Sequence, residues 1–405
     1  MRSGTPNRPE PVKGERASLR PAAVLAVAGC LALVISACSG NSKDIASHPS
    51  AGTSAAAQGT TPSDGPTRAV HPRARGKAFV PRSVSAVSAK RVWVLGERRC
   101  VKSSCRAVAY RSGDGGTSWQ RLHLPSTPFR SDPSAANSGV SQIAFANDTT
   151  GWMFGPDLWV THTGGDNWRR VDVPGDVEGL AAGRGAVWAM VGACTPGQGC
   201  EAQVMLRAQL PNGRFDPVTL PGPLLGGGPV PDLAASGDTV AVLTNLPPMP
   251  PGDHNLVEVT TDGGATWVSR RAPCLNELGG ELAVSGTSVW AVCPTGSLAH
   301  VYVTTGGPFK TVDVFGGPLP SFTDVTALAP DTALAVVLGA RVFRTTNAGV
   351  SWQRVQLPPQ ARQGEGMVTS FSSPGHGYAV TIGATGSGLM RSDDGGQHWR
   401  PIMVP

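Results

Sequence analysis

The sequence predicts an all-β fold, a seven-bladed β-propeller made of four-stranded antiparallel blades. The chain has 52 Gly and 36 Pro among 405 residues, and after residue 38 no stretch keeps a sustained apolar spacing of 3.6 residues. Many short strands joined by turns are therefore expected instead of helices. In addition, one short motif recurs at blade-sized intervals, and each interval holds four strand-like runs.

The N-terminus has the pattern of an export signal. Five Lys or Arg precede residues 21–35, an apolar run too short for an ordinary membrane-spanning helix. The run ends in Ile35-Ser36-Ala37-Cys38, which resembles the lipobox of bacterial lipoproteins, where the Cys thiol receives diacylglycerol. We expect Cys38 to be lipidated and to hold the protein on the extracytoplasmic side of the cell membrane. A plain secretory signal with a chance Cys is the alternative.

A low-complexity segment follows the signal. Residues 39 to about 76 are mostly Ser, Ala, Thr, Pro and Gly, and without large apolar side chains they cannot offset their ordering entropy. A flexible tether of ~38 residues spans on the order of 30 to 40 Å. The predicted organisation is a signal peptide over 1–37, a lipidated Cys and tether over 38–76, and a propeller over 77–405.

The charge of the mature chain excludes several function classes. The formal charge is +6, but residues 1–38 carry five cations and two acids, which leaves 29 Lys or Arg against 26 Asp or Glu, or +3. This excess is too small to indicate nucleic-acid binding. No nucleophile elbow, zinc-type His motif or phosphate-binding glycine loop is present, so we assign no catalytic residue, metal or cofactor and expect a monomer.

Six cysteines follow Cys38 and fall into three pairs along the chain. An even number fits an oxidising compartment. The first two pairs each close a short loop between strand-like runs, which favours disulfides that staple hairpins, and no His has the spacing of a metal site. The expected pairs are Cys100 with Cys105, Cys194 with Cys200, and Cys274 with Cys293.

The recurring motif reads approximately Ser/Thr-x-Asp-x-Gly-x-Thr-Trp. Its Asp or Asn is suited to accept hydrogen bonds from nearby backbone N–H groups, its Gly to adopt a positive φ, and its Trp to pack between sheets. The motif is therefore interpreted as a structural hairpin turn. Its five copies carry Asp114, Thr163, Asp262, Asn347 and Asp394 at the Asp position and Trp119, Trp168, Trp267, Trp352 and Trp399 at the Trp position.

Two weaker copies of the motif end at Phe215 and Phe309. With them, the aromatic residues that end the seven copies are 42 to 52 residues apart, which is the size of a blade. A second strand-like run, such as VWVLG at 92, recurs in all seven units. Its large aromatic residues are expected in the core between blades and not in a platform for sugars. These residues are Trp93, Trp152, Trp188 and Trp290.

The motif is identified as the Asp box, or BNR repeat, of the sialidase-like and photosystem II assembly factor-like propellers. The resemblance covers roughly residues 78–405, and the segment from Phe79 also resembles the start of exported actinobacterial propellers of this kind. It implies that the boxes lie opposite the usual binding face. Because the last unit ends just after its fourth strand, ring closure is expected to depend on packing between the first and last blades.

The sialidase reaction itself is not expected. It needs three Arg, a Tyr paired with Glu, and an Asp acid. The three Tyr of the chain, Tyr110, Tyr302 and Tyr378, all fall inside strand-like runs, and Phe79-Val80-Pro81-Arg82 does not match the Arg-Ile-Pro signature of sialidases.

The face opposite the boxes carries the extra residues of the chain, and function is expected there. We interpret this face as a surface for an envelope or secreted protein partner. A glycoside hydrolase acting on envelope or host glycans is the alternative, because it needs just two carboxylates across a cleft. The inserts are residues 123–139, 193–201, 220–231, 245–255 and 357–366.

Four acidic residues fall at the start of the first strand in four consecutive units: Glu178, Asp232, Glu281 and Asp324. Together they would gather negative charge at the mouth of the central channel, where a cation or a basic group could bind. The alternative is that they are four solvated edge charges facing different ways.

Overall fold

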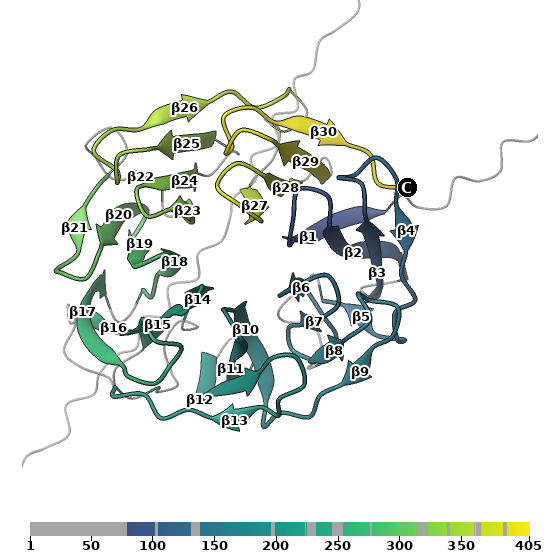
Figure 1. Cartoon of the computed structure of the whole chain (residues 1–405), viewed down its shortest axis with the longest axis horizontal. Helices are drawn as coiled ribbons and strands as arrows, with labels where there is room; N and C mark the ends of the chain where they lie inside the picture. Colours follow the sequence, from purple (N-terminus) through teal and green to yellow (C-terminus); the bar gives the residue numbers. More distant parts are fainter. Residues whose placement is uncertain are drawn as a thin grey trace, which may run out of the picture. The chain divides into compact units, whose positions relative to one another are not determined.

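Seven antiparallel sheets surround a central channel, as the sequence predicts (Figure 1). The computed structural model describes residues 79–405 except 102–103, 131–137, 196–198, 223, 225–231, 245–253, 276–277, 314–318, 321–322, 338–340, 360, 362–365 and 384–386. The predicted signal peptide, Cys38 and the tether lie outside the described residues, as do large parts of the five inserts. The residues that are described include no helix long and apolar enough to cross a membrane.

Each blade takes four consecutive strands, with the first innermost and the fourth outermost. Blade 1 contains β1 (Val80–Ala86), β2 (Val92–Val101), β3 (Ser104–Ser112) and β4 (Gln120–Arg121); blade 2 contains β6 (Gln142–Phe145), β7 (Gly151–Phe154), β8 (Trp159–Thr161) and β9 (Arg169–Arg170); blade 3 contains β10 (Asp176–Ala182), β11 (Ala186–Thr195), β12 (Gly199–Gln209) and β13 (Asp216–Pro217). Blade 4 contains β14 (Leu233–Ser236), β15 (Thr239–Thr244), β16 (His254–Thr260) and β17 (Val268–Leu275); blade 5 contains β18 (Glu281–Ser285), β19 (Ser288–Thr295), β20 (Leu298–Thr304) and β21 (Lys310–Thr311); blade 6 contains β23 (Thr323–Ala329), β24 (Thr332–Val337), β25 (Arg341–Thr345) and β26 (Gln353–Val355); blade 7 contains β27 (Gly366–Phe371), β28 (Gly377–Ile382), β29 (Gly388–Ser392) and β30 (Arg400–Ile402).

Two blades carry a short fifth strand that the sequence did not predict. β5 (Pro128–Phe129) and β22 (Leu319–Pro320) pair with the third strands of blades 1 and 5. Phe129 is only 6% exposed and packs into the core between blades 1 and 2. Part of the insert over 123–139 therefore belongs to the sheet of blade 1.

The second strands form the core between blades. β15 and β24 are buried at every position, because sheet neighbours flank them and another blade covers each face. The four tryptophans of the second strands are at most 2% exposed, which confirms the prediction that they belong to the core. Trp93 stacks on Phe145 of blade 2, and Trp188 meets the box tryptophan Trp267 of blade 4 edge to face.

Each Asp box is closed by hydrogen bonds among its own residues. In blade 1, Ser112 Oγ accepts from the Gly116 N–H at 2.8 Å and donates to Asp114, which accepts from the Ser118 N–H at 2.9 Å. The hydrogen bond from the Ser118 hydroxyl is the largest cause that lowers the pKa of Asp114, to about 2. In the blade 6 box, Asn347 Oδ1 accepts from the Ser351 N–H at 2.9 Å, so a neutral amide closes the same turn.

The box also locks the innermost hairpin of its own blade. One box residue with positive φ donates its N–H to a carbonyl in the turn between the first and second strands. These bonds are Gly115 to Lys90, Gly164 to Thr149, Gly263 to Asp238, Ala348 to Asp331 and Gly395 to Gly375, at 2.8 to 3.0 Å. Each full box thus ties the outer hairpin to the inner one.

Arginines just before the box connect neighbouring blades. Arg111, Arg344 and Arg391 each donate to a box glycine carbonyl of the next blade, at 2.9 to 3.0 Å. Arg391 makes this bond from blade 7 to Gly115 of blade 1, so the same contact closes the ring.

Within the described residues, the first and last blades exchange no strand. The Tyr378 hydroxyl donates to the Ala89 carbonyl at 2.8 Å, and Ser370 Oγ accepts from the Ala86 N–H at 3.0 Å. An apolar cluster that includes Val84, Val94 and Tyr378 fills the space between these blades. The expected closure by packing is therefore present, and these two hydrogen bonds and the Arg391–Gly115 contact add to it.

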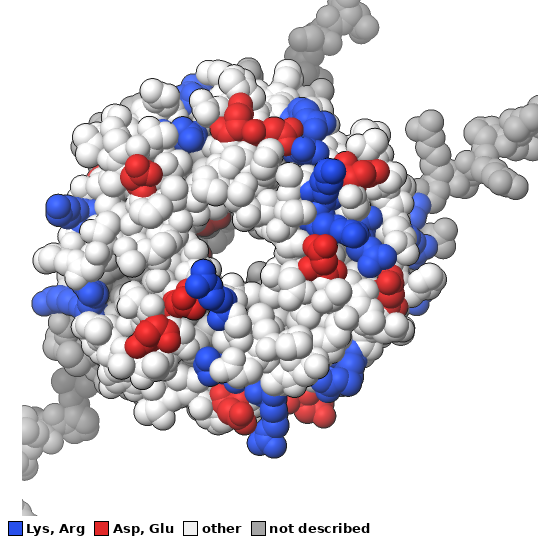
Figure 2. Space-filling view, in the orientation of Figure 1, with Lys and Arg blue, Asp and Glu red and all other residues white. Residues whose placement is uncertain are grey.

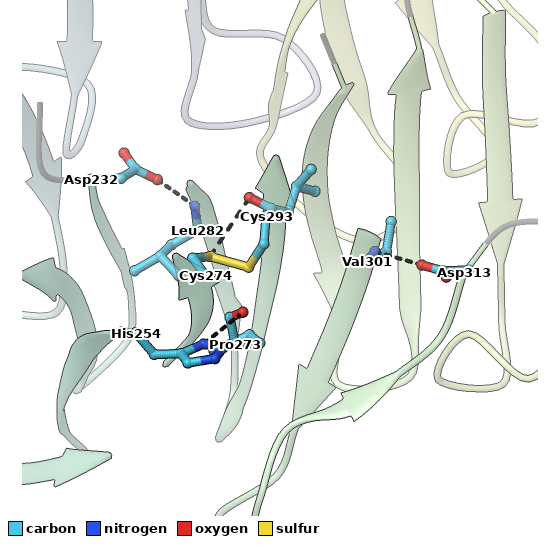
Figure 3. Close-up of a disulfide and its surroundings, with 9 residues drawn as sticks. Asp232, His254, Pro273, Cys274, Leu282, Cys293, Val301 and Asp313 are labelled. Carbon is cyan, nitrogen blue, oxygen red and sulfur yellow. Dashed lines mark hydrogen bonds between the residues drawn. A yellow bond between two sulfur atoms is a disulfide. The ribbon is translucent and has the colours of Figure 1, made fainter. Parts of the chain in front are cut away.

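The expected disulfide between Cys274 and Cys293 is present. It joins the fourth strand of blade 4 to the second strand of blade 5 and is almost completely buried (Figure 3). Cys105 is also disulfide-bonded, but the side chain of its expected partner Cys100 is outside the described residues. The side chains of the remaining pair are outside them too, although the backbone places Cys194 directly opposite Cys200.

Replacing Tyr378 with Phe should lower the free energy of unfolding by about 1–2 kcal/mol, because the Ala89 carbonyl would lose its donor in a largely buried place. Urea denaturation followed by tryptophan fluorescence measures the change. Tyr302→Phe is the matched control, since the Tyr302 hydroxyl makes no hydrogen bond within the described residues. Equal losses in the two variants would show that this bond does not help to close the ring.

Ala348→Gly should raise the free energy of unfolding by up to about 1 kcal/mol, because Ala348 has a φ of 53° at a position where the other four full boxes have Gly. The converse change, Gly395→Ala, should lower it, since the new Cβ would lie 2.6 Å from the Pro374 carbonyl oxygen. Calorimetric melting measures both variants. Destabilisation by Ala348→Gly would contradict the assigned turn.

Candidate functional site at the channel mouth

The two faces of the ring are built from different connections. Because each blade is antiparallel, the starts of the first strands, the second-to-third strand loops and the links between blades share one face, here called the loop face. The innermost hairpin turns and the Asp boxes share the other, here called the box face. Figure 2 shows an open centre, with cationic and acidic side chains intermingled around the rim on the side in view.

Three of the four predicted acidic residues come together at the loop-face end of the channel. Asp232 immediately precedes β14, Glu281 begins β18, and Asp324 is the second residue of β23. The negative charges of Asp232 and Asp324 both act on Glu281, and that of Asp232 acts on Asp324. These three acids therefore interact with one another across blades 4, 5 and 6.

The Asp232 carboxylate is held by the next blade. It accepts a hydrogen bond from the Leu282 N–H at the start of β18 (Figure 3). The backbone carbonyl of Asp232 accepts from the Leu243 N–H at 2.9 Å. The Cys274–Cys293 disulfide lies beside Leu282 and ties down the segment that leads to Glu281. Asp232 is thus positioned by the backbone of its own blade and of blade 5, and Glu281 by its place at the start of β18.

Burial and mutual repulsion favour the protonated forms of these carboxyls. Burial, followed by the charges of Asp232 and Asp324, raises the pKa of Glu281 to about 8, and burial followed by the charge of Asp232 raises the pKa of Asp324 to about 7. Burial also raises the pKa of Asp232. Protein atoms surround all three carboxyls, which is the source of the desolvation. Channel solvent nevertheless reaches them, since the Glu281 residue as a whole is exposed and Asp232 and Asp324 are half-buried, and this contact with solvent moderates the effect.

Glu178 does not join this group. It shares blade 3 with Asp176, whose charge raises the pKa of Glu178 in addition to the larger effect of burial, while Arg130 lowers it. Burial raises the pKa of Asp176 as well. Asp176 was missed in the sequence, although it lies two residues before Glu178 at the start of the same first strand.

The arrangement suits a cationic group better than a metal ion. The described residues contain no group of three or more His, Cys, Asp or Glu arranged to hold a metal. No Lys or Arg of the described part of the chain is among the charges that act on Asp232, Glu281 and Asp324. An incoming ammonium or guanidinium group would relieve the repulsion and favour the ionised carboxylates.

Solved structures share this fold at low sequence identity. YCF48 bound to D1 peptide matches with a TM-score of 0.52 and 14% identity, over 78% of this chain and 94% of that chain. YCF48 from Cyanidioschyzon merolae matches with a TM-score of 0.51 and 14% identity, over 78% and 96%. A GH74 enzyme from Niastella koreensis has a TM-score of 0.32 at 10% identity, over 79% and 71%, which is too distant to bear on function.

The chain matches no protein-family profile and no curated protein sequence. At these identities the structural similarity shows the β-propeller fold alone. Function has to be inferred from the faces of the ring.

The stability of the folded chain should fall as the pH rises through neutrality. The pKa of Glu281 is raised from 4.5 to about 8, so its stabilising contribution is fully present below pH 4.5 and is lost as the pH rises towards 8. Glu281→Gln removes this titration. The melting temperature of the variant, relative to wild type, should therefore be higher at about pH 9 than at about pH 5. A difference that does not change with pH would show that Glu281 titrates normally.

Proposed function

We propose that this propeller is a binding module that holds an envelope or secreted protein partner on its loop face. The observation that carries the proposal is the meeting of Asp232, Glu281 and Asp324 from three blades, without an opposing cation among the described residues. Carboxylates without a neighbouring cation at a channel mouth attract a basic side chain. The resulting ion pair becomes stronger when the bound side chain excludes water.

Two further observations support a protein partner. The links that precede β14, β18 and β23 belong to the loop face. A partner at the channel mouth would therefore also contact the inserted residues of this face. A protein of the same fold, YCF48, has been solved with D1 peptide bound. A peptide segment with a Lys or Arg at its tip is the ligand chemistry that fits the carboxylates.

The N-terminal region completes the proposal. Lipidation of Cys38 and a flexible tether over residues 39–76 would hold the propeller at the extracytoplasmic side of the membrane and leave its loop face free to meet a partner. The signal peptide over 1–37, the tether and a propeller beginning near residue 77 remain the proposed organisation.

The test is crosslinked co-purification of the tagged full chain from detergent-solubilised membranes. A stoichiometric partner should be recovered with wild type and lost with Glu281→Gln/Asp324→Asn, because neutral carboxamides cannot hold a cation. Asp238→Asn is the matched control, since Asp238 is an exposed acid in a hairpin turn of the box face. Equal recovery with all three proteins would contradict a partner at the channel mouth.

A glycoside hydrolase is the second candidate, and a specific observation favours it. Glu281, with a pKa near 8 beside two further carboxyls, has the protonation that a general acid needs at neutral pH. If the purified chain released reducing ends from envelope or host glycans and Glu281→Gln abolished this release, the binding proposal would give way to hydrolysis.

A further inference from the structure

A pocket of about 710 Å³ lies between the outer strands of blades 2 and 3. It is formed by the ends of β8 and β12, the start of β9 and the turn that follows β12, so it opens on the box face, away from the channel mouth. Its size is within the range of small-molecule sites. The reason for the pocket is found in the third copy of the box.

The third box has lost every group that closes the others. Counted back from the aromatic residue, Ala208 replaces the Ser or Thr, Leu210 the Asp, and Asn212 the Gly. No hydroxyl or carboxylate remains to fold the turn, and all three residues line the pocket instead.

The missing box glycine explains where the space is. In blade 2, Gly165 lies so close to Leu122 of blade 1 that an added Cβ would be 2.7 Å from its Cδ1. Gly349 of blade 6 covers Val312 of blade 5 in the same way, at 2.4 Å. Val171 occupies the equivalent position in blade 2. Its N–H bonds to the carbonyl of Leu158, next to the third strand, just as the N–H groups of Leu122 and Val312 bond to the third strands of their own blades. Val171, however, lines the pocket.

An indole N–H that no described protein group accepts from also lines the pocket. The Trp93 Nε1–H donates to the Gly164 carbonyl in the box of the next blade at 2.9 Å. Trp152 has the matching register on β7 and faces the third box, is 2% exposed and lines the pocket. Its indole N–H has no hydrogen-bond partner among the described residues, so a ligand with an acceptor atom would satisfy it.

The remaining lining is an apolar wall with a cationic rim. Val160, Val187 and Phe215 contribute hydrocarbon surface, and Arg169 and Arg214 are opposed by one acid of the lining, Asp172. Arg214 has an ion pair with Asp216 at 3.4 Å. Arg169 has neither an ion pair nor a hydrogen bond within the described part of the chain.

We propose that this pocket binds a small apolar carboxylate, an aliphatic or aromatic acid whose hydrocarbon part lies on the valine and phenylalanine wall. Its carboxylate would meet the Arg169 guanidinium and accept from the Trp152 indole N–H. The site is independent of the channel mouth, because it lies on the opposite face and uses none of its residues.

The test is equilibrium dialysis of the full chain in lipid nanodiscs against 4-phenylbutyrate and its neutral amide, with empty nanodiscs as the blank. Wild type should bind the acid saturably at one site and the amide at least about fivefold more weakly. Arg169→Gln should weaken binding of the acid roughly five- to tenfold and leave the amide unchanged. Val171→Phe, which fills the pocket, should abolish binding of both.

Lys310→Gln is the matched control, because Lys310 has the same register on the fourth strand of blade 5 as Arg169 has on that of blade 2. Beside Lys310, a box glycine covers Val312, the counterpart of Val171. It should bind like wild type. The proposal is overturned if binding is not saturable, if acid and amide bind equally, or if Arg169→Gln and Lys310→Gln behave alike. Because Arg169 is exposed on the surface, its substitution tests the site without risk to the fold.

Discussion

The hydrogen bond from a left-handed box residue to the innermost turn of the same blade is the contact on which this ring depends. It connects the outer hairpin of a blade to its inner hairpin, as from Gly115 to Lys90, and it is present in all five full boxes. Three of these boxes also offer a glycine carbonyl to an arginine of the preceding blade, so the same turn that orders one blade also binds its neighbour. Ring closure uses this arginine contact too, from Arg391 of blade 7 to Gly115 of blade 1.

This constraint separates the two faces of the propeller. On the box face, glycines pack against the preceding blade so closely that a Cβ would not fit, which leaves little room for a ligand. Where the third copy has lost its hydroxyl, carboxylate and glycine, the same architecture leaves a pocket over Val171 and an unpaired indole at Trp152. A local change in sequence thus creates a cavity without disturbing the four strands of either blade.

The loop face depends on a different set of contacts. Asp232 accepts from the backbone of blade 5, and the buried disulfide holds the segment that leads to Glu281, so the carboxyls are held together despite their repulsion. Burial raises the pKa of Glu281 and of Asp324, and the proximity of the other carboxylates raises it further. Such a site favours a ligand that brings its own positive charge, which distinguishes it from the cationic pocket on the opposite face.

The sequence by itself determined the number of blades, the place of each box turn and the burial of the second-strand tryptophans, because these follow from local spacing and from the size of aromatic side chains. It also indicated the Cys274–Cys293 pair and the acidic starts of four first strands. Only the tertiary structure decided that three of those acids meet while Glu178 stays with Asp176, since the rotation between blades sets which side chains share the channel mouth. The pocket at Trp152 likewise could not be predicted from the sequence, because it forms where the third box, in blade 3, leaves Val171 of blade 2 uncovered.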